Sequence, residues 1–389
     1  MGGAPLHRYS KVASWHLISG EYPPTPGGVS ASSRLIAKGL IAAGDEVVVW
    51  TRAGRRQAAD DEGIEVNRLP NSFGPFALGR LASRLRHAPA SRLLVQYVPQ
   101  AFGWKGMNWP FCDWLRRLHC RDLTVVFHEV AYPREAYQAA RLRLLSLVTH
   151  RMARLAAQAA TRIFVTTPQW SRMLRALAAG LAPILELPVF SNIPVVHDPA
   201  AVQALRMRAG GGEMQCIGHF GAFPRPLPDL LTAPLVACLR RAPARIALLF
   251  GYGSDRERDR IVREYPDLQA RIHAGGTLSE SRVSLHIQAC DVMLQPYPDG
   301  ATSRRGTLMA ALAHGVPVVT TIGALSEPLW MESGAVAAVP VGDQVALQQE
   351  LERLLASAQS RARLARAAGE LYAARFDISH AIAALRGEI

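Results

Sequence analysis

Short apolar runs recur along this 389-residue chain, and segments with helical periodicity separate them. Runs of this length and composition predict buried strands. The predicted strands are residues 12–19, 47–51, 93–97, 125–128 and 163–166 in the first half, and 215–220, 246–250, 292–295, 318–321 and 335–339 in the second. The predicted strands therefore form two consecutive series along the chain.

Amphipathic segments lie between these strands and predict helices. They are residues 30–43, 108–118, 134–159 and 169–178 in the first half, and 228–241, 255–263, 280–289, 304–314 and 344–356 in the second. Apolar strands that alternate with such helices form parallel sheets covered on both faces. The chain is therefore expected to be an α/β protein with two Rossmann-like domains.

Asparagine and proline mark the predicted boundary between the domains, at Asn192 and Pro194. We predict a first domain of residues 1–192 and a second of residues 193–360. Two more helical segments follow after the second sheet is complete. Because their apolar side chains still need burial, residues 361–389 are expected to pack back on the first domain.

Basic residues are concentrated in the first half of the chain. Residues 1–192 contain 24 Lys and Arg against 12 Asp and Glu, whereas residues 193–389 contain 20 against 19. This asymmetry indicates either a polyanionic partner of the first domain or a solvated basic face. The expected partner is an anionic membrane surface or an anionic acceptor, and not nucleic acid.

One basic segment, residues 76–87, raises a membrane hypothesis. Leu78, Leu81 and Leu85 share one side of the predicted helix, and arginines flank them. This is typical of a helix in a lipid interface, and equally of a surface helix whose leucines face a core. No apolar run reaches the ~18 residues of a membrane span. The expected location is therefore the cytoplasm, with peripheral binding to the inner face of the cell membrane as the hypothesis.

Glycine and proline fill the junction between the first predicted strand and the first helix, from Glu21 and Tyr22 to Gly27 and Gly28. Consecutive glycines let the backbone approach a ligand, and a helix N-terminus offers free N–H groups and a positive dipole end. A plain strand-to-helix turn has the same composition. The spacing differs from the G-x-G-x-x-G fingerprint, so it does not favour NAD binding.

His128 and Glu129 follow the predicted strand 125–128 at its carboxyl end. In open α/β sheets, ligands bind at that edge. A histidine there can hydrogen-bond a sugar hydroxyl, and Glu129 can bind an acceptor. The alternative is a pair of residues that cap the next helix.

The most informative segment, residues 291–321, has the order strand, polar loop, helix and strand. Thr302 or Ser303 is the predicted N-cap. Arg304 and Arg305 then fall in the first turn, where the helix dipole disfavours a positive side chain by up to ~1 kcal/mol. A bound diphosphate would explain that placement, because it accepts hydrogen bonds from helix N–H groups and guanidinium groups. Two solvated surface arginines are the alternative.

Taken together, these segments resemble the family-4-like, retaining glycosyltransferases of the GT-B fold over nearly the whole chain. The resemblance is carried by the glycine loop at residues 27–28, by residues 40–51, 192–194 and 251–254, and by residues 289–296. It implies two Rossmann-like domains that face each other across a cleft, with the acceptor on the first and a nucleotide-sugar donor on the second. It also implies retaining hexosyl transfer to a saccharide or lipid-linked saccharide in bacterial polysaccharide or glycolipid synthesis. No metal or other cofactor is expected.

The resemblance also implies roles for particular residues. His128 would lie by the transferred sugar, while Arg225, Arg304 and Arg305 would stabilise the leaving diphosphate. Tyr22 and Glu129 would meet the acceptor. The donor-binding residues would be Gly27, Gly28, Gly221, Gly253, Gly276, Thr277, Leu278, Asp299, Gly300, Thr302, Ser303, Gly306 and Thr307.

The chain departs from the family pattern at two places. Typical members carry two glutamates eight positions apart around the phosphate-binding helix, where this chain has Thr302 and Ala310. Asp299 is a carboxylate three residues before the first of these positions. Members also carry an arginine and a lysine after the first strand of the second domain, where His219 and Arg225 are the candidates.

Two other functions fit the same architecture. A sugar-nucleotide 2-epimerase would need acid–base groups in the cleft, and Glu129 and Asp299 are the evident ones. A non-catalytic sugar-nucleotide- or polysaccharide-binding subunit would fit the missing glutamates. Release of free nucleoside diphosphate on mixing with donor and acceptor separates turnover from binding.

Overall fold

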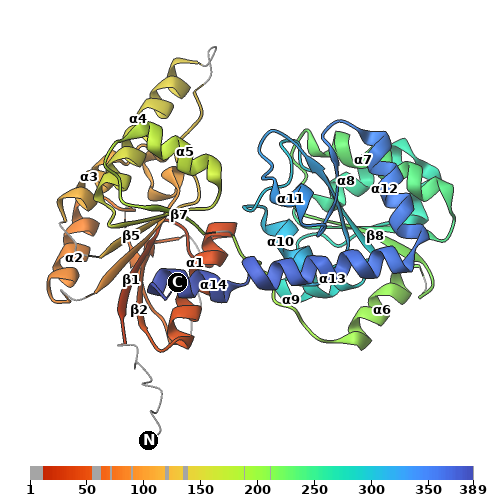
Figure 1. The fold of residues 1–389 in the computed structure, drawn as a ribbon, viewed down its shortest axis with the longest axis horizontal. Coiled ribbons are helices and arrows are strands. Elements are labelled where there is room, and N and C mark those ends of the chain that lie inside the picture. The colour runs from red at the N-terminus through yellow and green to blue at the C-terminus, as the bar shows by residue number, and fades with distance from the viewer. Residues whose placement is uncertain are drawn as a thin grey trace, which may run out of the picture. The chain divides into compact units, whose positions relative to one another are not determined.

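A computed structural model gives the structure of the chain. It describes residues 12–54, 63–70, 72–88, 91–118, 122–134, 139–187, 189–210 and 212–388. The chain forms two compact units, one of Met1–Leu187 with Ala381–Ile389 and the other of Pro188–His380. Each unit contains one parallel sheet with helices packed on it (Figure 1).

The sheet of the first unit has seven strands among the described residues, in the order β3-β2-β1-β4-β5-β6-β7. The chain builds outward from β1 on one side and then from β4 on the other, and every strand pair is parallel. The strands are β1 (Ser14–Ser19), β2 (Glu46–Arg52), β3 (Glu65–Leu69), β4 (Arg92–Tyr97), β5 (Leu123–Phe127), β6 (Arg162–Val165) and β7 (Ile184–Glu186).

Helices of the first unit follow the strands in the order expected for a Rossmann-like domain. They are α1 (Gly28–Ala42), α2 (Pro75–Arg86), α3 (Trp109–Arg117), α4 (Ala140–Ala159) and α5 (Pro168–Leu177), with 3-10 turns η1 (Pro99–Phe102) and η2 (Trp104–Gly106). Three aromatic rings pack together in the core beside the sheet. Phe102 stacks on Phe111 with ring centroids 4.3 Å apart, and Phe73 contacts both at 5.3 and 5.1 Å.

Helix α2 directs its leucines towards the protein core. Leu78 and Leu81 are buried, and Leu85 packs against the same cluster. Arg84 and Arg86 lie on the exposed side. The hypothesis that this apolar face lies in a lipid interface is therefore wrong, because the core already removes it from water.

The sheet of the second unit has six described strands, in the order β10-β9-β8-β11-β12-β13. Again every pair is parallel. The strands are β8 (Gln215–Phe220), β9 (Arg245–Phe250), β10 (Ile272–Ala274), β11 (Val292–Gln295), β12 (Val318–Ile322) and β13 (Ala337–Pro340).

Helices cover both faces of this second sheet (Figure 1). One apolar cluster packs α7, α8 and α12 on the sheet, and another packs α9, α10 and α11. The helices are α6 (Pro199–Ala209), α7 (Leu227–Arg241), α8 (Ser254–Glu264), α9 (Glu280–Gln288), α10 (Gly306–Ala313), α11 (Leu329–Glu332), α12 (Gln344–Ala356) and α13 (Ala358–Arg375), with the 3-10 turn η3 (Pro266–Arg271).

The last helix, α14 (Ile378–Arg386), brings the end of the chain to the first unit, to which Ala381–Ile389 belong. Arg386 Nε lies 3.6 Å from a carboxylate oxygen of Asp45, whose side chain is fully buried. Trp15 Nε1 donates to the same oxygen at 3.0 Å. Helix α13 belongs to the second unit, so only the end of the segment that was expected to return lies on the first.

Strands β3, β7 and β10 were not predicted, and all three are edge strands. An edge strand has a neighbour on one side only and need not be apolar on both faces. Exposure is high in β7, where Leu185 is 52% exposed. The apolar-run criterion therefore finds the central strands and misses these.

Candidate functional site

Strand order indicates a candidate binding edge in the second unit. Strand β8 lies between β9 and β11, so the loop after β8 leads to α7 on one face and the loop after β11 leads to α10 on the other. Ligands of open parallel sheets bind where neighbouring loops separate in this way. The loop after β8 begins at Gly221, and the loop after β11 occupies residues 296–305.

Two arginines and one carboxylate meet in the loop after β11. Arg305 forms an ion pair with Asp299, and Arg304 Nη2 lies 3.8 Å from the other oxygen of that carboxylate. The guanidinium of Arg305 lies over the ring of Tyr297, 4.7 Å from its centroid. The Tyr297 hydroxyl and Thr307 Oγ1 are 2.8 Å apart. Two guanidinium groups thus lie around one carboxylate, and guanidinium groups are suited to bind an anionic ligand.

Helix α10 begins one residue after Arg305, which is its N-cap residue. The prediction that Thr302 or Ser303 caps the helix, with both arginines in the first turn, is therefore wrong. The backbone N–H of Ser303 donates to both carboxylate oxygens of Glu327, at 3.1 and 3.2 Å. Arg305 is held by Asp299 in an extended conformation, with φ −80° and ψ 91°. The position of the two arginines is therefore explained by an ion pair within the protein, and not only by an external anion.

Four buried polar atoms at this edge have no hydrogen-bond partner in the described structure. They are His219 Nε2, Gln295 Oε1, Thr302 Oγ1 and Arg305 Nε. Buried polar atoms are nearly always paired, so each of these needs a partner from a ligand or from water. Their position, at the ends of β8 and β11 and in the loop after β11, coincides with the edge that the topology selects.

His219 is an uncharged hydrogen-bond acceptor. Its Nδ1 donates to the carbonyl oxygen of Leu294 at 2.7 Å, which leaves Nε2 without a proton. Burial lowers the pKa of His219 to about 4, although the backbone hydrogen bond opposes this.

Close backbone approach requires glycine at two positions of this edge. At Gly251, where φ is +114°, an added Cβ would lie 2.1 Å from the carbonyl oxygen of Gly221. At Gly300, where φ is +92°, an added Cβ would lie 2.2 Å from Ser326 Oγ. Side chains at either position would separate the loops.

Further predicted donor-binding residues lie in the loops after β9 and β10. Gly253 is the N-cap of α8 in the left-handed conformation. The N–H of Gly276 donates to Ser254 Oγ at 3.0 Å, which joins the two loops. Thr277 follows, and Leu278 packs against the core.

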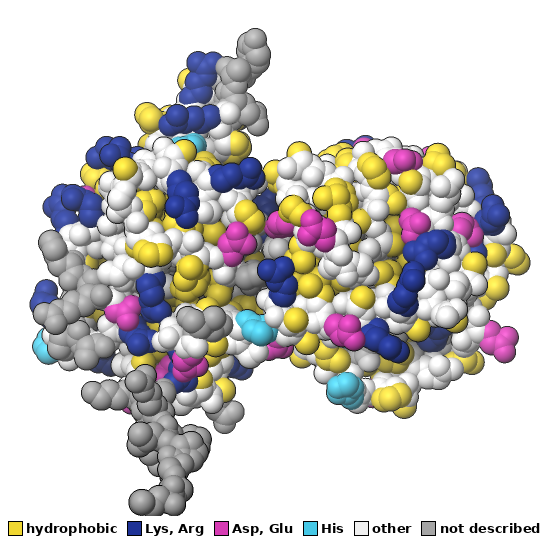
Figure 2. Space-filling model, in the orientation of Figure 1, with side chains coloured by type: hydrophobic (Ala, Val, Ile, Leu, Met, Phe, Trp, Pro, Cys, Tyr) yellow, Lys and Arg dark blue, Asp and Glu magenta, His cyan; other side chains and the backbone are white. Residues whose placement is uncertain are grey.

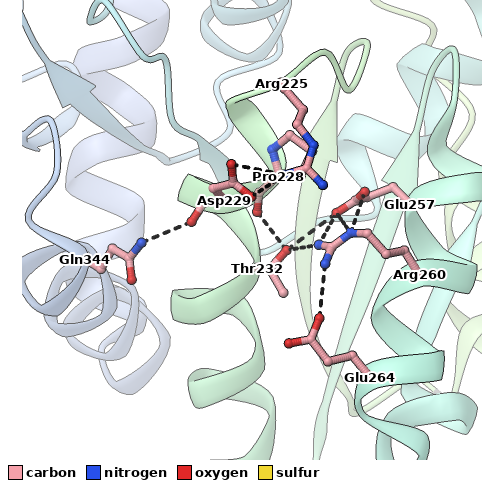
Figure 3. A network of polar contacts seen from close by, with 8 residues as sticks. All are labelled: Arg225, Pro228, Asp229, Thr232, Glu257, Arg260, Glu264 and Gln344. Atoms are coloured by element: carbon pink, nitrogen blue, oxygen red, sulfur yellow. Dashed lines mark hydrogen bonds and ion pairs between the residues drawn. The ribbon is translucent and has the colours of Figure 1, made fainter.

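Arg225 pairs with a different carboxylate from the one that Arg304 and Arg305 contact. Its side chain is 76% exposed and pairs with Asp229 at 3.1 Å (Figure 3). It lines a pocket beside α7 and α8 whose lining includes none of Asp299, Arg304 and Arg305. The structure therefore does not place Arg225 in the cluster formed by Asp299, Arg304 and Arg305.

The first unit has a corresponding edge at β1 and β4. Gly27 is the N-cap of α1, and a Cβ added to it would lie 3.1 Å from Glu21 Oε2. Burial raises the pKa of Glu21, Arg52 opposes the rise, and Glu129 adds to it. Tyr22 is only 2% exposed. The glycine loop therefore faces a carboxylate, and Tyr22 lies mostly within the protein.

His128 follows β5 at the same edge and is held in one orientation. Its Nε2 lies 2.6 Å from Gln96 Oε1, and its carbonyl oxygen accepts from Trp170 Nε1 at 3.0 Å. Burial lowers the pKa of His128 to about 4, so the ring is neutral near pH 7. The neutral ring donates from Nε2 to Gln96 and keeps Nδ1 as an acceptor. Glu129 beside it is exposed.

Gln96, Gln295 and Glu21 were missed as site residues. A partial signal was present for the two glutamines, because each is an amide at or next to the last position of a largely apolar strand. Only the fold shows that these strands lie where the strand order reverses. Glu21 was part of the glycine-loop motif, but only the fold shows its carboxylate against Gly27. Within the part of the chain that the structure describes, no three His, Cys, Asp or Glu residues gather as a metal site would require.

Two protein-family models match the chain, one in each unit. Residues 27–189 match the "Glycosyl transferase 4-like domain", and residues 216–357 match "Glycosyl transferases group 1". None of the curated proteins is significantly similar to the chain in sequence.

Solved structures share the fold over almost the whole chain. Sucrose-phosphate synthase from Thermosynechococcus elongatus is 21% identical, with a TM-score of 0.71 over 97% of this chain and 98% of that one. The Anabaena protein HepE, solved with UDP-glucose, is 17% identical, with a TM-score of 0.67 over 96% and 98%. WaaG, a glycosyltransferase involved in lipopolysaccharide biosynthesis, is 16% identical, with a TM-score of 0.65 over 96% and 100%.

The two consecutive family models span most of the chain, and each falls on one Rossmann-like unit. The parallel sheets of seven and six strands match the fold of these solved glycosyltransferases. The chain therefore belongs to the family-4-like glycosyltransferases of the GT-B fold.

Proposed function

We propose that the protein transfers a hexosyl unit, with retention, from a nucleotide-sugar donor to a saccharide or lipid-linked saccharide in bacterial polysaccharide or glycolipid synthesis. The observation that carries the proposal is the cluster of Asp299, Arg304 and Arg305 at the edge where β8 and β11 separate. The solved structures of HepE with UDP-glucose and with UDP support a nucleotide sugar as the donor.

In the proposed reaction, the bond between C1 of the sugar and the diphosphate oxygen breaks while C1 bonds to an acceptor oxygen on the same face. The acceptor's proton passes to the leaving diphosphate. Negative charge grows on that group, and positive side chains already in place stabilise it. Arg304 and Arg305 supply this charge beside the free N–H groups at the start of α10. The protein is proposed to need no metal ion or other cofactor.

Acceptor atoms at the two sheet edges fit hydroxyl-bearing ligands. His219 Nε2 and Gln295 Oε1 in the second unit are buried and unpaired, and each can accept from a hydroxyl. His128 in the first unit keeps Nδ1 as an acceptor beside Glu129. Thr302 and Ala310 stand where typical members have their two glutamates, so donor hydroxyls would meet other groups than in those members.

A donor screen followed by a turnover assay tests this proposal. UDP-, GDP-, ADP- and dTDP-sugars are screened first by thermal shift, because a ligand bound only by the folded protein raises its melting temperature. The stabilising donor is then mixed with saccharide and lipid-linked acceptors. We expect nucleoside diphosphate to be released only when both substrates are present. A sugar isomer without transfer would indicate the epimerase, and binding without any product would indicate the binding subunit.

A lipid-linked acceptor is favoured by a surface on α4 and its neighbours. Leu144 and Leu147 are 54% and 60% exposed, and Trp104 and Trp109 are 47% and 44% exposed. The guanidinium of Arg151 lies 6.0 Å from the ring centroid of Trp109. Basic and hydrophobic side chains lie together over α4 in Figure 2. Apolar and aromatic side chains among arginines are typical of a surface that binds anionic lipid.

Vesicle flotation tests this membrane proposal. We expect salt-sensitive binding to vesicles with anionic lipid and weaker binding when Leu144 and Leu147 are both changed to serine. Val345→Ser is the matched control, because Val345 is 65% exposed on α12 of the other unit. Equal binding by all three proteins, or none at low salt, would refute the proposal. No helix of the described residues combines the length and apolarity needed to cross a membrane.

A further inference from the structure

All non-glycine residues with a left-handed backbone in the described part of the chain gather at one place in the first unit. Ser72, Trp104 and Lys105 have φ of +59°, +52° and +54°. Gly103 and Gly106 flank the last two with φ of +88° and +85°, so four consecutive residues are left-handed. We call these four residues the left-handed turn. A Cβ added to Gly103 would lie 2.8 Å from Ser72 Cβ, so Ser72 lies against the turn.

The surrounding structure holds this unfavourable backbone in place. A left-handed conformation costs free energy in any residue that has a side chain. Asn108, which is fully buried, donates from Nδ2 to the carbonyl oxygens of Phe102 at 2.9 Å and Phe73 at 3.2 Å, the residues next to the turn and next to Ser72. Strain that a fold maintains in this way is found mainly at functional sites.

The left-handed turn lies in the loop after β4, at the candidate edge of the first sheet. This loop starts between two segments that were predicted to meet the acceptor. The N–H of His128 donates to the carbonyl oxygen of Tyr97, the last residue of β4, at 3.1 Å. A Cβ added to Gly20, directly before Glu21, would lie 2.4 Å from the carbonyl oxygen of Ala101. The turn therefore belongs to the edge where ligands of an open sheet bind.

The strained backbone presents an indole ring to solvent, because Trp104 is 47% exposed. Four other tryptophans donate their indole N–H to a protein acceptor: Trp15, Trp50, Trp170 and Trp330. Trp104 has no such partner among the described residues. Its ring face carries negative charge that suits the C–H groups of a sugar ring, and its N–H can donate to a hydroxyl.

We propose that Trp104 is the platform on which a sugar ring of the acceptor stacks, and that the left-handed turn holds the indole in position. The proposal rests on the proposed function, in which the acceptor is a saccharide or a lipid-linked saccharide. A Cβ added to Gly106 would lie 3.4 Å from Leu145 Cδ1, so the turn touches α4. The sugar of a lipid-linked acceptor would therefore meet Trp104 while its lipid meets the exposed leucines of α4.

Saturation-transfer NMR tests the proposal on the full-length protein without any turnover. The probes are methyl β-D-glucopyranoside, methyl β-D-galactopyranoside and methyl α-D-mannopyranoside. Trp104→Ala removes the platform, and Trp104→Phe keeps an aromatic face. Trp109→Ala is the matched control, because Trp109 is 44% exposed in the first turn of α3. Lys105→Gly relieves the strain next to the platform and leaves the indole in place.

We expect at least one glycoside to bind wild type, and Trp104→Ala to weaken its binding about tenfold. The affinity of Trp104→Phe should lie between those two. Trp109→Ala and Lys105→Gly should bind as wild type, and Lys105→Gly should melt no lower than wild type. In the turnover assay, Trp104→Ala should raise KM for the acceptor and leave KM for the donor unchanged.

The proposal is overturned if no glycoside binds wild type, or if Trp104→Ala binds it equally well. It is also overturned if Trp104→Ala and Trp109→Ala reduce binding to anionic vesicles alike and leave glycoside binding unchanged, because Trp104 would then contact lipid. Failure of the proposed function is a separate result, since wild type would then bind a glycoside without releasing nucleoside diphosphate. Unchanged melting temperatures show that the two Trp104 variants are folded.

Discussion

Replacing Arg305 by alanine perturbs the proposed diphosphate site more directly than any other change. Arg305 is 26% exposed and pairs with Asp299, which is 34% exposed, while Arg304 contacts the same carboxylate at 3.8 Å. The substitution removes one positive charge from the loop after β11. It also removes a planar group with several N–H donors from beside the start of α10.

The expected magnitude follows from the interaction that is lost. A hydrogen bond to a charged group contributes roughly 1.5–3 kcal/mol, which corresponds to donor binding about 10–150 times weaker. Because the site is partly open to water, we expect the lower part of this range. The donor affinity of Arg305→Lys should lie between those of wild type and Arg305→Ala, since lysine keeps the charge but lacks the planar guanidinium fork. The free energy of unfolding should change by less than about 1 kcal/mol, as for other partly exposed ion pairs.

Isothermal titration calorimetry with the nucleoside diphosphate selected by the donor screen measures the effect. Arg353→Ala is the control, because Arg353 pairs with Glu350 on exposed α12, away from the loops. The dependence of affinity on salt should also become weaker in Arg305→Ala, as the charge contribution decreases. If Arg304→Ala and Arg305→Ala both bind the diphosphate as tightly as wild type, the cluster is a structural ion pair and the donor site lies elsewhere.

Three further changes test other parts of the structure. The pKa of His219 is lowered to about 4 from 6.5, so the unfolded chain binds a proton that the folded ring does not. The free energy of unfolding should therefore fall as the pH drops from 6.5 to about 4, by up to about 1.4 kcal/mol per pH unit. Urea titrations of His219→Gln should show a smaller fall over the same pH range. Gly300→Ala should lower the free energy of unfolding by about 1–3 kcal/mol. Gly79 lies in open space within α2, so Gly79→Ala should raise the free energy of unfolding slightly. Equal melting temperatures of the Gly300→Ala and Gly79→Ala variants would contradict the argument that Gly300 is required by its backbone conformation. Arg386→Ala should destabilise the first unit by about 3 kcal/mol in thermal unfolding, because it leaves the buried Asp45 carboxylate without its cation; an unchanged transition would show that α14 does not brace that unit.

Local patterns in the sequence predicted the central elements of both units. The predicted ranges for β8, β11 and α12 agree with the structure at both ends. Periodicity reports which side of a segment is buried, and burial on both faces is a property of the middle of a sheet. The same reasoning found only one of the four described edge strands, β13, and missed β3, β7 and β10, because an edge strand has fewer neighbours and can have a mixed composition.

The sequence also located the polar loops of the candidate site but not the contacts within them. It named Asp299 and Arg305 separately, and the structure joins them. It placed Ser303 in a helix cap, whereas Glu327, 24 residues further on, holds its N–H. Capping rules consider only nearby residues, and a partner brought in by the fold overrides them.

Segment type, domain order and family were thus determined by the chain's own periodicity and motifs. Tertiary structure decided that the leucine face of α2 packs on the protein core, where α10 begins and which carboxylate each arginine meets. It also decided that Gln96 and Gln295 lie at the candidate binding edges, because strand order sets which strand ends are neighbours. The physical reason is that the hydrophobic pattern of a segment can be read from that segment alone. An ion pair or a buried hydrogen bond joins two groups that are distant in the sequence, and only the fold brings them within about 3–4 Å of each other.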